Sequence, residues 1–213
     1  MSRSRDRAPR IAARALLLAG VVQLAYGGYV VLDSSVYDAI AHERLEEARE
    51  RTRVAQPAIQ GLVTATAIRD GTAIGEIHIP RIGLTAIVAE GESPAVLRRA
   101  VGHLADTALP WGSGNVVLAG HRDTVFRPLK GIHAGDAITL RTQYGDVEYR
   151  VEWTAVVPPT EVGVLRSTGR STLTLITCFP FSYLGPAPER FVVRAREVSR
   201  YGWPTENRTT LRR

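Results

Sequence analysis

The residue best suited to chemistry in this chain is its single cysteine, Cys178, which ends an apolar, β-branched run starting at Ser171. Without a second cysteine, Cys178 cannot form an internal disulfide, so it is either a buried apolar residue or a reactive thiol. The run predicts a β-strand that ends at Phe179-Pro180, because proline cannot continue the hydrogen-bonded ladder. A thiol at the open end of a strand is within reach of a substrate. From its position alone, the reactive and the structural interpretations stay equally open.

Two other residues at strand ends could act together with this thiol. His121 follows the apolar run 115–120, and histidine is the usual partner of a catalytic cysteine because it titrates near neutrality. Arg190 opens the apolar run 190–195, and its guanidinium could hold a substrate carbonyl or stabilise an oxyanion. Each residue also has a simpler interpretation, as a turn histidine and as a surface arginine.

The order of these three residues and the sequences around them resemble those of the sortases, the cysteine transpeptidases of bacterial surfaces. The family pattern Thr-Leu-x-Thr-Cys is met by residues 174–178, and residues 114–120 resemble the segment that precedes the family's histidine. The segments 121–129 and 185–190 look most like the class D group. The resemblance extends from about residue 75 to residue 197 and covers most of the chain.

The resemblance implies a role for each of the three residues. Cys178 attacks a peptide carbonyl, His121 protonates the leaving amine, and Arg190 stabilises the oxyanion or fixes the substrate backbone. The product is a thioester on the enzyme, which an amine resolves into a new amide. Sortases cut C-terminal sorting signals of the Leu-Pro-x-Thr-Gly type between threonine and the following small residue.

Four residues are expected to contact the peptide. Thr177 precedes the cysteine, while Pro158, Val162 and Val164 lie in a loop that could contact an apolar Leu-Pro element. The partners implied by the resemblance are surface proteins that carry a sorting signal. The implied acceptor is an amine of a cell-wall peptide or of a pilin lysine.

Other histidines are expected to take no part in the chemistry. His103 is the main alternative to His121, but no comparable strand run precedes it. The spacing of His42, His78 and His133 does not fit a metal site with the cysteine. No dense acidic loop indicates calcium. We therefore expect neither a metal nor a cofactor.

The N-terminal segment is expected to anchor the chain in a membrane. Residues 1–14 carry five arginines against one aspartate, and residues 15–32 carry no charge. An apolar run of this kind approaches the roughly 20 residues needed to cross a bilayer, and the preceding positive charges predict a cytoplasmic N-terminus. The expected location is the bacterial cytoplasmic membrane, with a single span and the catalytic domain outside. The alternative is a cleaved signal peptide.

The rest of the chain predicts a mainly β fold. Short β-like runs lie at 86–89, 115–119, 137–141, 147–157, 172–177 and 190–195, and residues 93–105 predict a short helix with Pro94 in its first turn. Such a pattern is typical of a small closed barrel, which the resemblance makes an eight-stranded sortase barrel with short helices. The expected organisation is a cytoplasmic tail (1–14), a transmembrane anchor (15–32), a helical stalk and linker (33–72), the catalytic barrel (73–199) and a polar tail (200–213).

Charge and motif order weigh against other classes of protein. The net charge is +6, but the basic residues are almost all arginines, several of them in the tails, and no nucleic-acid-binding motif stands out. A papain-like peptidase would need its cysteine before its histidine. Two alternatives stay open: another extracytoplasmic cysteine peptidase, and a membrane-tethered barrel that binds peptides without catalysis. The second predicts a missing member of the trio, and none is missing.

Overall fold

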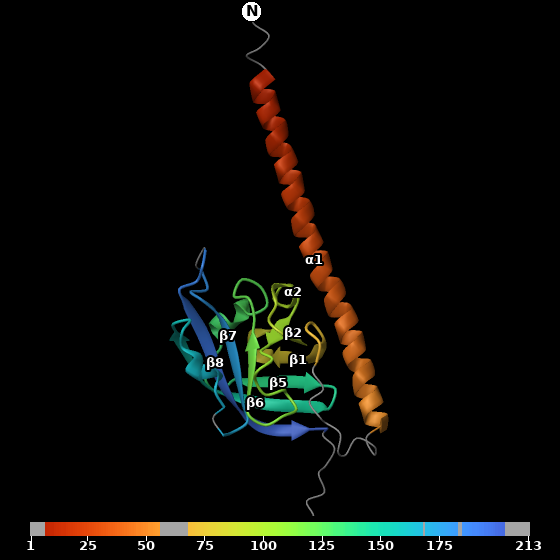
Figure 1. Ribbon diagram of the computed structural model, residues 1–213, viewed down its shortest axis with the longest axis vertical. Helices are drawn as coiled ribbons and strands as arrows, with labels where there is room; N and C mark the ends of the chain where they lie inside the picture. Colours follow the sequence, from red (N-terminus) through yellow and green to blue (C-terminus); the bar gives the residue numbers. More distant parts are fainter. Residues whose placement is uncertain (1–6, 56–67, 168, 183–184, 203–213) are drawn as a thin grey trace, which may run out of the picture. The chain divides into compact units, whose positions relative to one another are not determined.

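The computed structural model describes residues 7–55, 68–167, 169–182 and 185–202 (Figure 1). The chain divides into two compact units, one up to Tyr37 and one from Asp38 onward. The long helix α1 (Arg7–Ala55) contributes its first part to one unit and its last part to the other.

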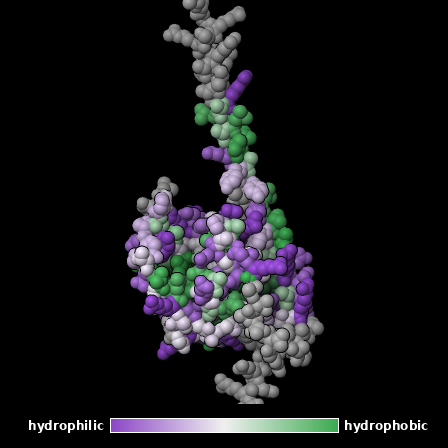
Figure 2. Space-filling model, viewed as in Figure 1, coloured by the Kyte–Doolittle hydropathy of each residue, from purple (hydrophilic) through white to green (hydrophobic). Residues whose placement is uncertain are grey.

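The first unit consists of the first part of α1. Among the residues that the structure describes, no helix is both long and apolar enough to span a membrane. The apolar side chains between residues 16 and 24 form an exposed surface (Figure 2). More than half of the surface is exposed for each of Leu16, Leu17, Leu18, Val21, Val22 and Leu24.

Within the described residues, the second unit is built around a closed barrel of eight strands in the order β1-β2-β3-β4-β7-β8-β6-β5. The strands are β1 (Ala73–Ile79), β2 (Leu84–Glu90), β3 (Val101–His103), β4 (Asn115–Ala119), β5 (Ala137–Thr142), β6 (Gly145–Val157), β7 (Thr172–Phe179) and β8 (Glu189–Tyr201). The short helices are α2 (Pro94–Leu97), η1 (Pro80–Ile82), η2 (Arg127–Gly131) and η3 (Val162–Leu165). Among the strand pairs of this described part, β2–β3 and β4–β7 are parallel and the others are antiparallel. The predicted eight-stranded, mostly antiparallel barrel is confirmed.

The alternation of side chains along each strand fills the barrel with aliphatic groups. The inward residues of β4, β5, β7 and β8 are at most 2% exposed, and they are Val116, Leu118, Ile138, Leu140, Leu173, Leu175, Val193 and Ala195. Burying one such side chain stabilises the fold by about 1.5–3 kcal/mol. Because the period is two, the residues between them face outward, and in β4, β7 and β8 these include the polar residues Asn115, Thr172, Thr174 and Arg194.

The helix predicted over residues 93–105 is wrong beyond Leu97, because the chain turns there and forms β3 instead. Gly102 lies at the centre of this short strand. A Cβ atom on Gly102 would lie only 2.4 Å from the carbonyl oxygen of Gly91. The close approach of the two backbones therefore requires glycine, a constraint that helical propensity does not contain.

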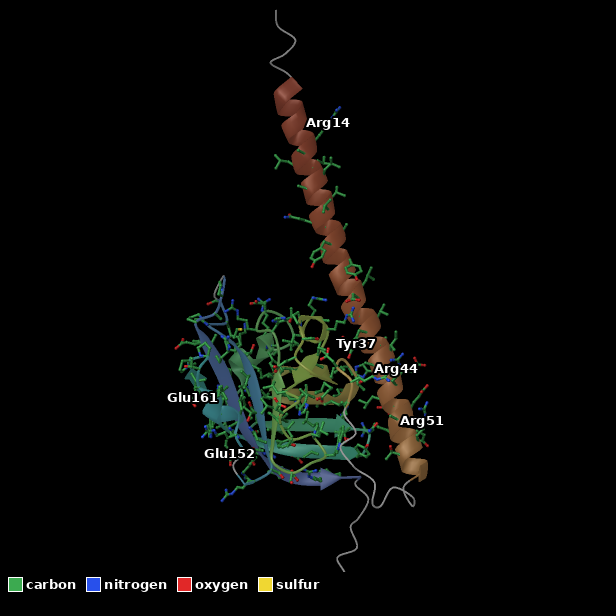
Figure 3. All side chains as sticks on the ribbon, in the orientation of Figure 1. Arg14, Tyr37, Arg44, Arg51, Glu152 and Glu161 are labelled. Carbon is green, nitrogen blue, oxygen red and sulfur yellow. The ribbon has the colours of Figure 1, made fainter. Side chains whose placement is uncertain are left out.

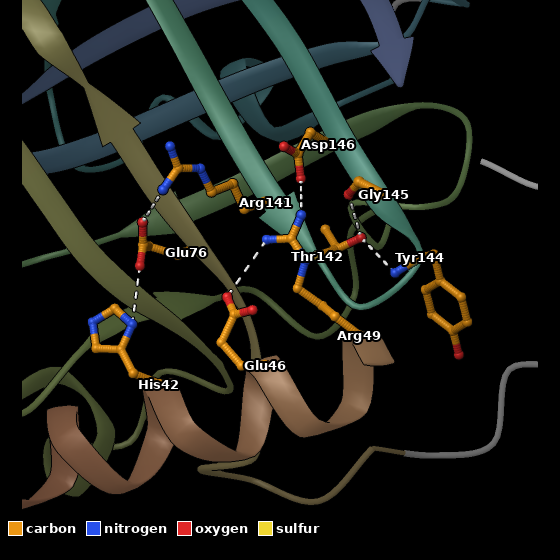
Figure 4. A network of polar contacts seen from close by, with 9 residues as sticks. All are labelled: His42, Glu46, Arg49, Glu76, Arg141, Thr142, Tyr144, Gly145 and Asp146. Atoms are coloured by element: carbon orange, nitrogen blue, oxygen red, sulfur yellow. Dashed lines mark hydrogen bonds and ion pairs between the residues drawn. The ribbon is translucent and has the colours of Figure 1, made fainter. Parts of the chain in front are cut away.

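Within the second unit, the last part of α1 packs on the barrel. Ala41 and Leu45 are buried at 4% and 5% exposure, whereas Arg44 and Arg51 are exposed and project into solvent (Figure 3). Two ion pairs flank the apolar contact, and both are drawn in Figure 4. His42 Nδ1 lies 3.0 Å from Glu76 Oε2, and Arg49 binds Asp146 at the start of β6.

The segment that connects β4 to β5 is held by a buried carboxylate at its C-terminal end, just before β5. Asp136 is 8% exposed, and it accepts hydrogen bonds from Arg81 Nε and Nη2 and from the backbone N–H of His133. The hydrogen bond from the Arg81 guanidinium holds the pKa of the Asp136 carboxyl below its usual value, and the His133 amide adds to this effect. A lowered pKa in the folded state means that Asp136 contributes stability above about pH 4, the carboxyl's value in the unfolded chain, and that the contribution disappears as pH falls through the folded value.

We expect Asp136→Asn to lower the free energy of unfolding by about 1–2 kcal/mol at pH 7, because the charged acceptor is lost. The difference from the wild type should shrink below about pH 4, where the wild-type carboxyl also becomes neutral. Urea denaturation between pH 7 and pH 3 measures this difference, with the exposed Asp106→Asn as the control. A difference that stays constant over this range would contradict the role of the carboxylate.

Candidate active site

The parallel pairing of β4 with β7 brings two chain segments to the same edge of the barrel. Ala119 pairs with Ile176, and the backbone N–H of Gly120 still donates to the carbonyl of Ile176 at 3.2 Å. Two residues beyond this pair lie His121, just after the end of β4, and Cys178, which is still within β7 and paired with β8. Side chains two residues apart along a strand share a face, so Cys178 continues the outward row of β7.

Thr177 ties these two strand ends together. Its side chain is 2% exposed, and its hydroxyl donates to the carbonyl of Gly120 at 2.7 Å. It continues the inward row of Leu173 and Leu175, opposite to the face of Cys178. The hydroxyl is therefore engaged within the barrel, and this geometry lends no support to the expected contact with a peptide.

Arg190 lies beside the cysteine on the neighbouring strand. In the antiparallel register of β7 and β8, Cys178 is directly opposite Arg190, so the two side chains share the outward face. The Arg190 Nη1 donates to the carbonyls of Glu189 and Ala187 at 2.9 and 3.2 Å. Cys178 and Arg190 are partly exposed and His121 is exposed. The structure thus gathers a thiol, an imidazole and a guanidinium at one end of the outer face of β4, β7 and β8.

The alternative histidine is not accessible. The ring of His103 is fully buried, with Nδ1 2.8 Å from Glu90 Oε2 and Nε2 2.9 Å from the carbonyl oxygen of Ala108. Both ring nitrogens are engaged, so of the two candidate histidines only His121 is accessible to a substrate. Within the described parts of the chain, no three His, Cys, Asp or Glu side chains come together as a metal site.

One wall of the outer face is the β6–β7 connection. Val117 and Val192 point outward from β4 and β8, yet both are fully buried, so other parts of the chain cover them. Asn115, at the start of β4, donates through Nδ2 to the carbonyls of Val164 and Leu165 in η3 at 3.2 and 3.0 Å. The β6–β7 connection is thus fastened over the end of the face farthest from the cysteine.

The expected peptide contacts Pro158, Val162 and Val164 all lie on this connection. Pro158 and Val162 are exposed, and 57% of the surface of Val162 faces solvent, whereas Val164 is half-buried. In Figure 2, apolar side chains gather over β7 and β8 on the visible face, with polar ones around them. This surface is suited to an extended peptide with apolar residues.

The other wall is the β7–β8 connection, which a buried arginine holds in place. Arg122 is 6% exposed, and it donates from Nη1 to the carbonyl of Pro180 at 3.0 Å and from Nη2 to that of Gly185 at 3.1 Å. Sequence reasoning missed this residue, because nothing in the order His121-Arg122-Asp123 tells that the arginine turns inward. The residue next to the exposed histidine therefore holds the loop that follows the cysteine.

Three aromatic rings close the same end of the barrel. Phe179 and Phe181 stand edge to face with centroids 5.9 Å apart, and both rings also contact Phe191 on β8. Such pairs contribute about 0.5–1.5 kcal/mol beyond their buried area. Together with Arg122, they hold the described parts of the loop between the cysteine and Arg190, residues 179–182 and 185–189, against the barrel.

Known proteins are similar to this chain in both sequence and fold. A family model described as a sortase domain matches residues 77–198. Sortase D of Bacillus subtilis (strain 168) is 31% identical over 194 residues, which covers 86% of this chain and 96% of that protein.

Solved structures agree with the sequence comparison. The Sortase D5 transpeptidase of Clostridium perfringens superposes with a TM-score of 0.66 at 26% identity, covering 77% of this chain and 99% of that one. Sortase C of Clostridium perfringens SM101 gives a TM-score of 0.57 at 26% identity, with 75% and 90% covered. The resemblance inferred from the motifs, including its class D character, is confirmed.

We expect Arg122→Leu to lower the free energy of unfolding by about 2 kcal/mol, because the carbonyls of Pro180 and Gly185 lose their donors. Amide hydrogen exchange at Gly185, Ala187 and Glu189 should become faster, since local opening costs less once the loop is released. The exposed Arg127→Leu serves as the control and should change the unfolding free energy by less than about 0.5 kcal/mol. Equal exchange rates in the wild type and Arg122→Leu would show that the arginine does not hold this loop.

Proposed function

The chain belongs to the sortase family, whose members are cysteine transpeptidases that cleave sorting signals, and we propose that Cys178 is its nucleophile. The observation that carries this proposal is the register of β4, β7 and β8, in which His121 and Arg190 flank the only cysteine of the chain. His121 is the proposed acid–base group, and Arg190 is the proposed oxyanion stabiliser.

The reaction begins with a proton on His121 and the thiolate form of Cys178. The Sγ atom attacks the carbonyl carbon of the peptide, and the negative charge that develops on the carbonyl oxygen is stabilised by the guanidinium of Arg190. When the tetrahedral intermediate collapses, the C–N bond breaks and His121 gives its proton to the departing amine. The product is a thioester between Cys178 and the new C-terminus of the substrate.

An amine then completes the transfer. It attacks the thioester carbon while His121 accepts its proton, the C–S bond breaks, and a new amide forms with Cys178 again as thiolate. Water in place of the amine gives hydrolysis. The proposed donors are surface proteins that end in a Leu-Pro-x-Thr-Gly-like signal, and the proposed acceptors are amines of cell-wall peptide or of a pilin lysine.

The proposed peptide path follows the outer face between the two loops. The exposed Val162 and Pro158 and the half-buried Val164 would contact the apolar Leu-Pro part of the signal. The scissile bond would then lie at the end of the face near Cys178.

We also propose that residues 15–32 anchor the enzyme in the cytoplasmic membrane with the catalytic domain outside. The support comes from the uncharged apolar run, the arginines before it, and the exposed leucines and valines on this part of α1. Surface proteins with sorting signals would meet the enzyme on that side of the membrane.

The chemistry is tested with the full chain in detergent, quenched Leu-Pro-x-Thr-Gly-type peptides and oligoglycine. Mass spectrometry should find a peptide thioester on Cys178 and an amine-ligated product, and Cys178→Ala should give neither. His121→Ala and Arg190→Ala should each lower kcat/KM by about 10²–10³-fold, whereas the exposed Arg196→Ala should stay within about twofold. A folded wild type with a titratable thiol but no adduct would favour the binding barrel. Cleavage that never yields a ligated product would favour a peptidase.

The anchor is tested by fractionation of cells that produce the full chain. Leu18→Arg combined with Val22→Arg should shift the protein out of the membrane fraction, because each charge near the middle of a span costs about 2.5–3.5 kcal/mol. Ile40→Arg, an exposed position farther along α1, should leave the distribution unchanged. A wild type that is soluble, or that has lost residues 1–32 by cleavage, would contradict the anchor.

A further inference from the structure

Arg194 is a buried cation that the proposed chemistry does not use. It lies on β8 four residues after Arg190, at about 13 Å along the strand, and on the same outward face. Only 5% of its surface is exposed, and among the described residues no carboxylate forms an ion pair with it. Burying a charge in this way is costly, so its hydrogen bonds must offset the loss of water.

The donors of Arg194 point into the β6–β7 connection. Its Nη2 donates to the carbonyl of Val164 at 2.6 Å, and its Nη1 donates to the hydroxyl of Thr172 at 3.3 Å. The guanidinium carbon lies 5.6 Å from the centre of the Trp153 ring on β6. Its Nε is buried and has no partner in the described part of the chain. Burial lowers the pKa of Arg194, yet an arginine stays charged at neutral pH.

Asn115 reinforces the same contact from β4. While its Nδ2 donates to the carbonyls of Val164 and Leu165, its Oδ1 accepts from the hydroxyls of Thr172 at 3.1 Å and Thr174 at 2.7 Å. Outward side chains of β4 and β8 therefore converge on two carbonyls of η3, and the β7 threonines orient Asn115 for this contact. This short helix is fastened to the barrel floor by side-chain donors rather than by the pairing of strands.

We propose that Arg194 is a positioning residue that sets the place of η3 and thereby the selectivity of the site for the apolar part of its peptide. The inference rests on the proposed function, because Val162 and Val164 are the residues of η3 expected to contact the Leu-Pro element. Arg194 acts through Val164 and is too far along β8 to touch the reacting atoms. A lysine would not replace it, because one ammonium cannot reproduce the planar fork that spans the Val164 carbonyl and the Thr172 hydroxyl.

The test compares the wild type, Arg194→Met and Arg194→Lys as full chains in detergent. Arg196→Met is the matched control, because Arg196 lies on the same strand and 54% of its side chain is exposed. For each protein, kcat and KM are measured with a Leu-Pro-x-Thr-Gly-type peptide and with the same peptide carrying alanine as its first residue. The rate of alkylation of Cys178 by iodoacetamide reports on the thiol. Amide hydrogen exchange at residues 162–167 reports on η3, and thermal unfolding reports on the stability of the fold.

For Arg194→Met we expect KM for the leucine peptide to rise about tenfold, with kcat and the alkylation rate within about twofold of the wild type. The preference for leucine over alanine should fall about tenfold, because a displaced η3 no longer encloses the side chain. Arg194→Lys should lie between the wild type and Arg194→Met, and Arg196→Met should match the wild type. If Arg194→Met does not fold, Arg194→Lys is judged by the same measurements.

Two outcomes would overturn the proposal. One is a folded variant with unchanged KM and unchanged peptide preference. The other is a loss of kcat with a parallel loss of alkylation, since this pattern would mean that Arg194 acts at the thiol. If the wild type turns over no peptide, the proposed function fails. Hydrogen exchange then tests only whether Arg194 holds η3 in place. Faster exchange at residues 162–167 in the variant, by about tenfold or more, would support the contact with η3, and equal exchange would refute it.

Discussion

The site depends above all on the parallel pairing of β4 with β7. This pairing fixes Ala119 against Ile176, and the level of His121 relative to Cys178 follows from it. A shift by one residue would turn Cys178 into the barrel and leave His121 outside, because side chains alternate with a period of two. The hydrogen bond from Thr177 to Gly120 holds this register at the point where the two strands end. A hydroxyl that touches no reacting atom thus sets the level at which the histidine and the cysteine meet.

The β6–β7 and β7–β8 connections beside the site are held in the same way, each by a buried arginine. Arg122 donates to carbonyls of the β7–β8 connection, and Arg194 donates to a carbonyl of the β6–β7 connection. Neither loop is paired as a strand along its length, so its backbone acceptors need donors from elsewhere. An arginine suits this task because its donors spread over several acceptors and its charge persists at neutral pH. The floor of the site is therefore shaped by aliphatic packing, and its sides are shaped by buried cations.

The sequence was sufficient for the features that local patterns encode. The strand Asn115–Ala119 was predicted with the bounds that the structure shows, and the family to which Cys178, His121 and Arg190 pointed is confirmed. The sequence was insufficient where a contact with a distant segment determines the local structure. Residues 101–103 form a strand because Gly102 lets two backbones approach, and this contact is invisible in a helical pattern that starts at Pro94.

The buried arginines are a second case in which the sequence alone did not suffice. Arg122 and Arg194 look like the many exposed arginines of the chain until the carbonyls that they meet are known.

The pairing of β4 with β7 also has a consequence for the timing of reactivity during folding. Thr177 and Gly120 are 57 positions apart, so the histidine and the cysteine meet only after a long stretch of chain has been closed into a loop. Contacts of this kind form late, because the entropy of loop closure must be overcome before the contact stabilises anything. Until then Cys178 lies on a chain that has not yet brought His121 to its level. The proposed nucleophile thus gains its proposed partner only when the barrel has closed.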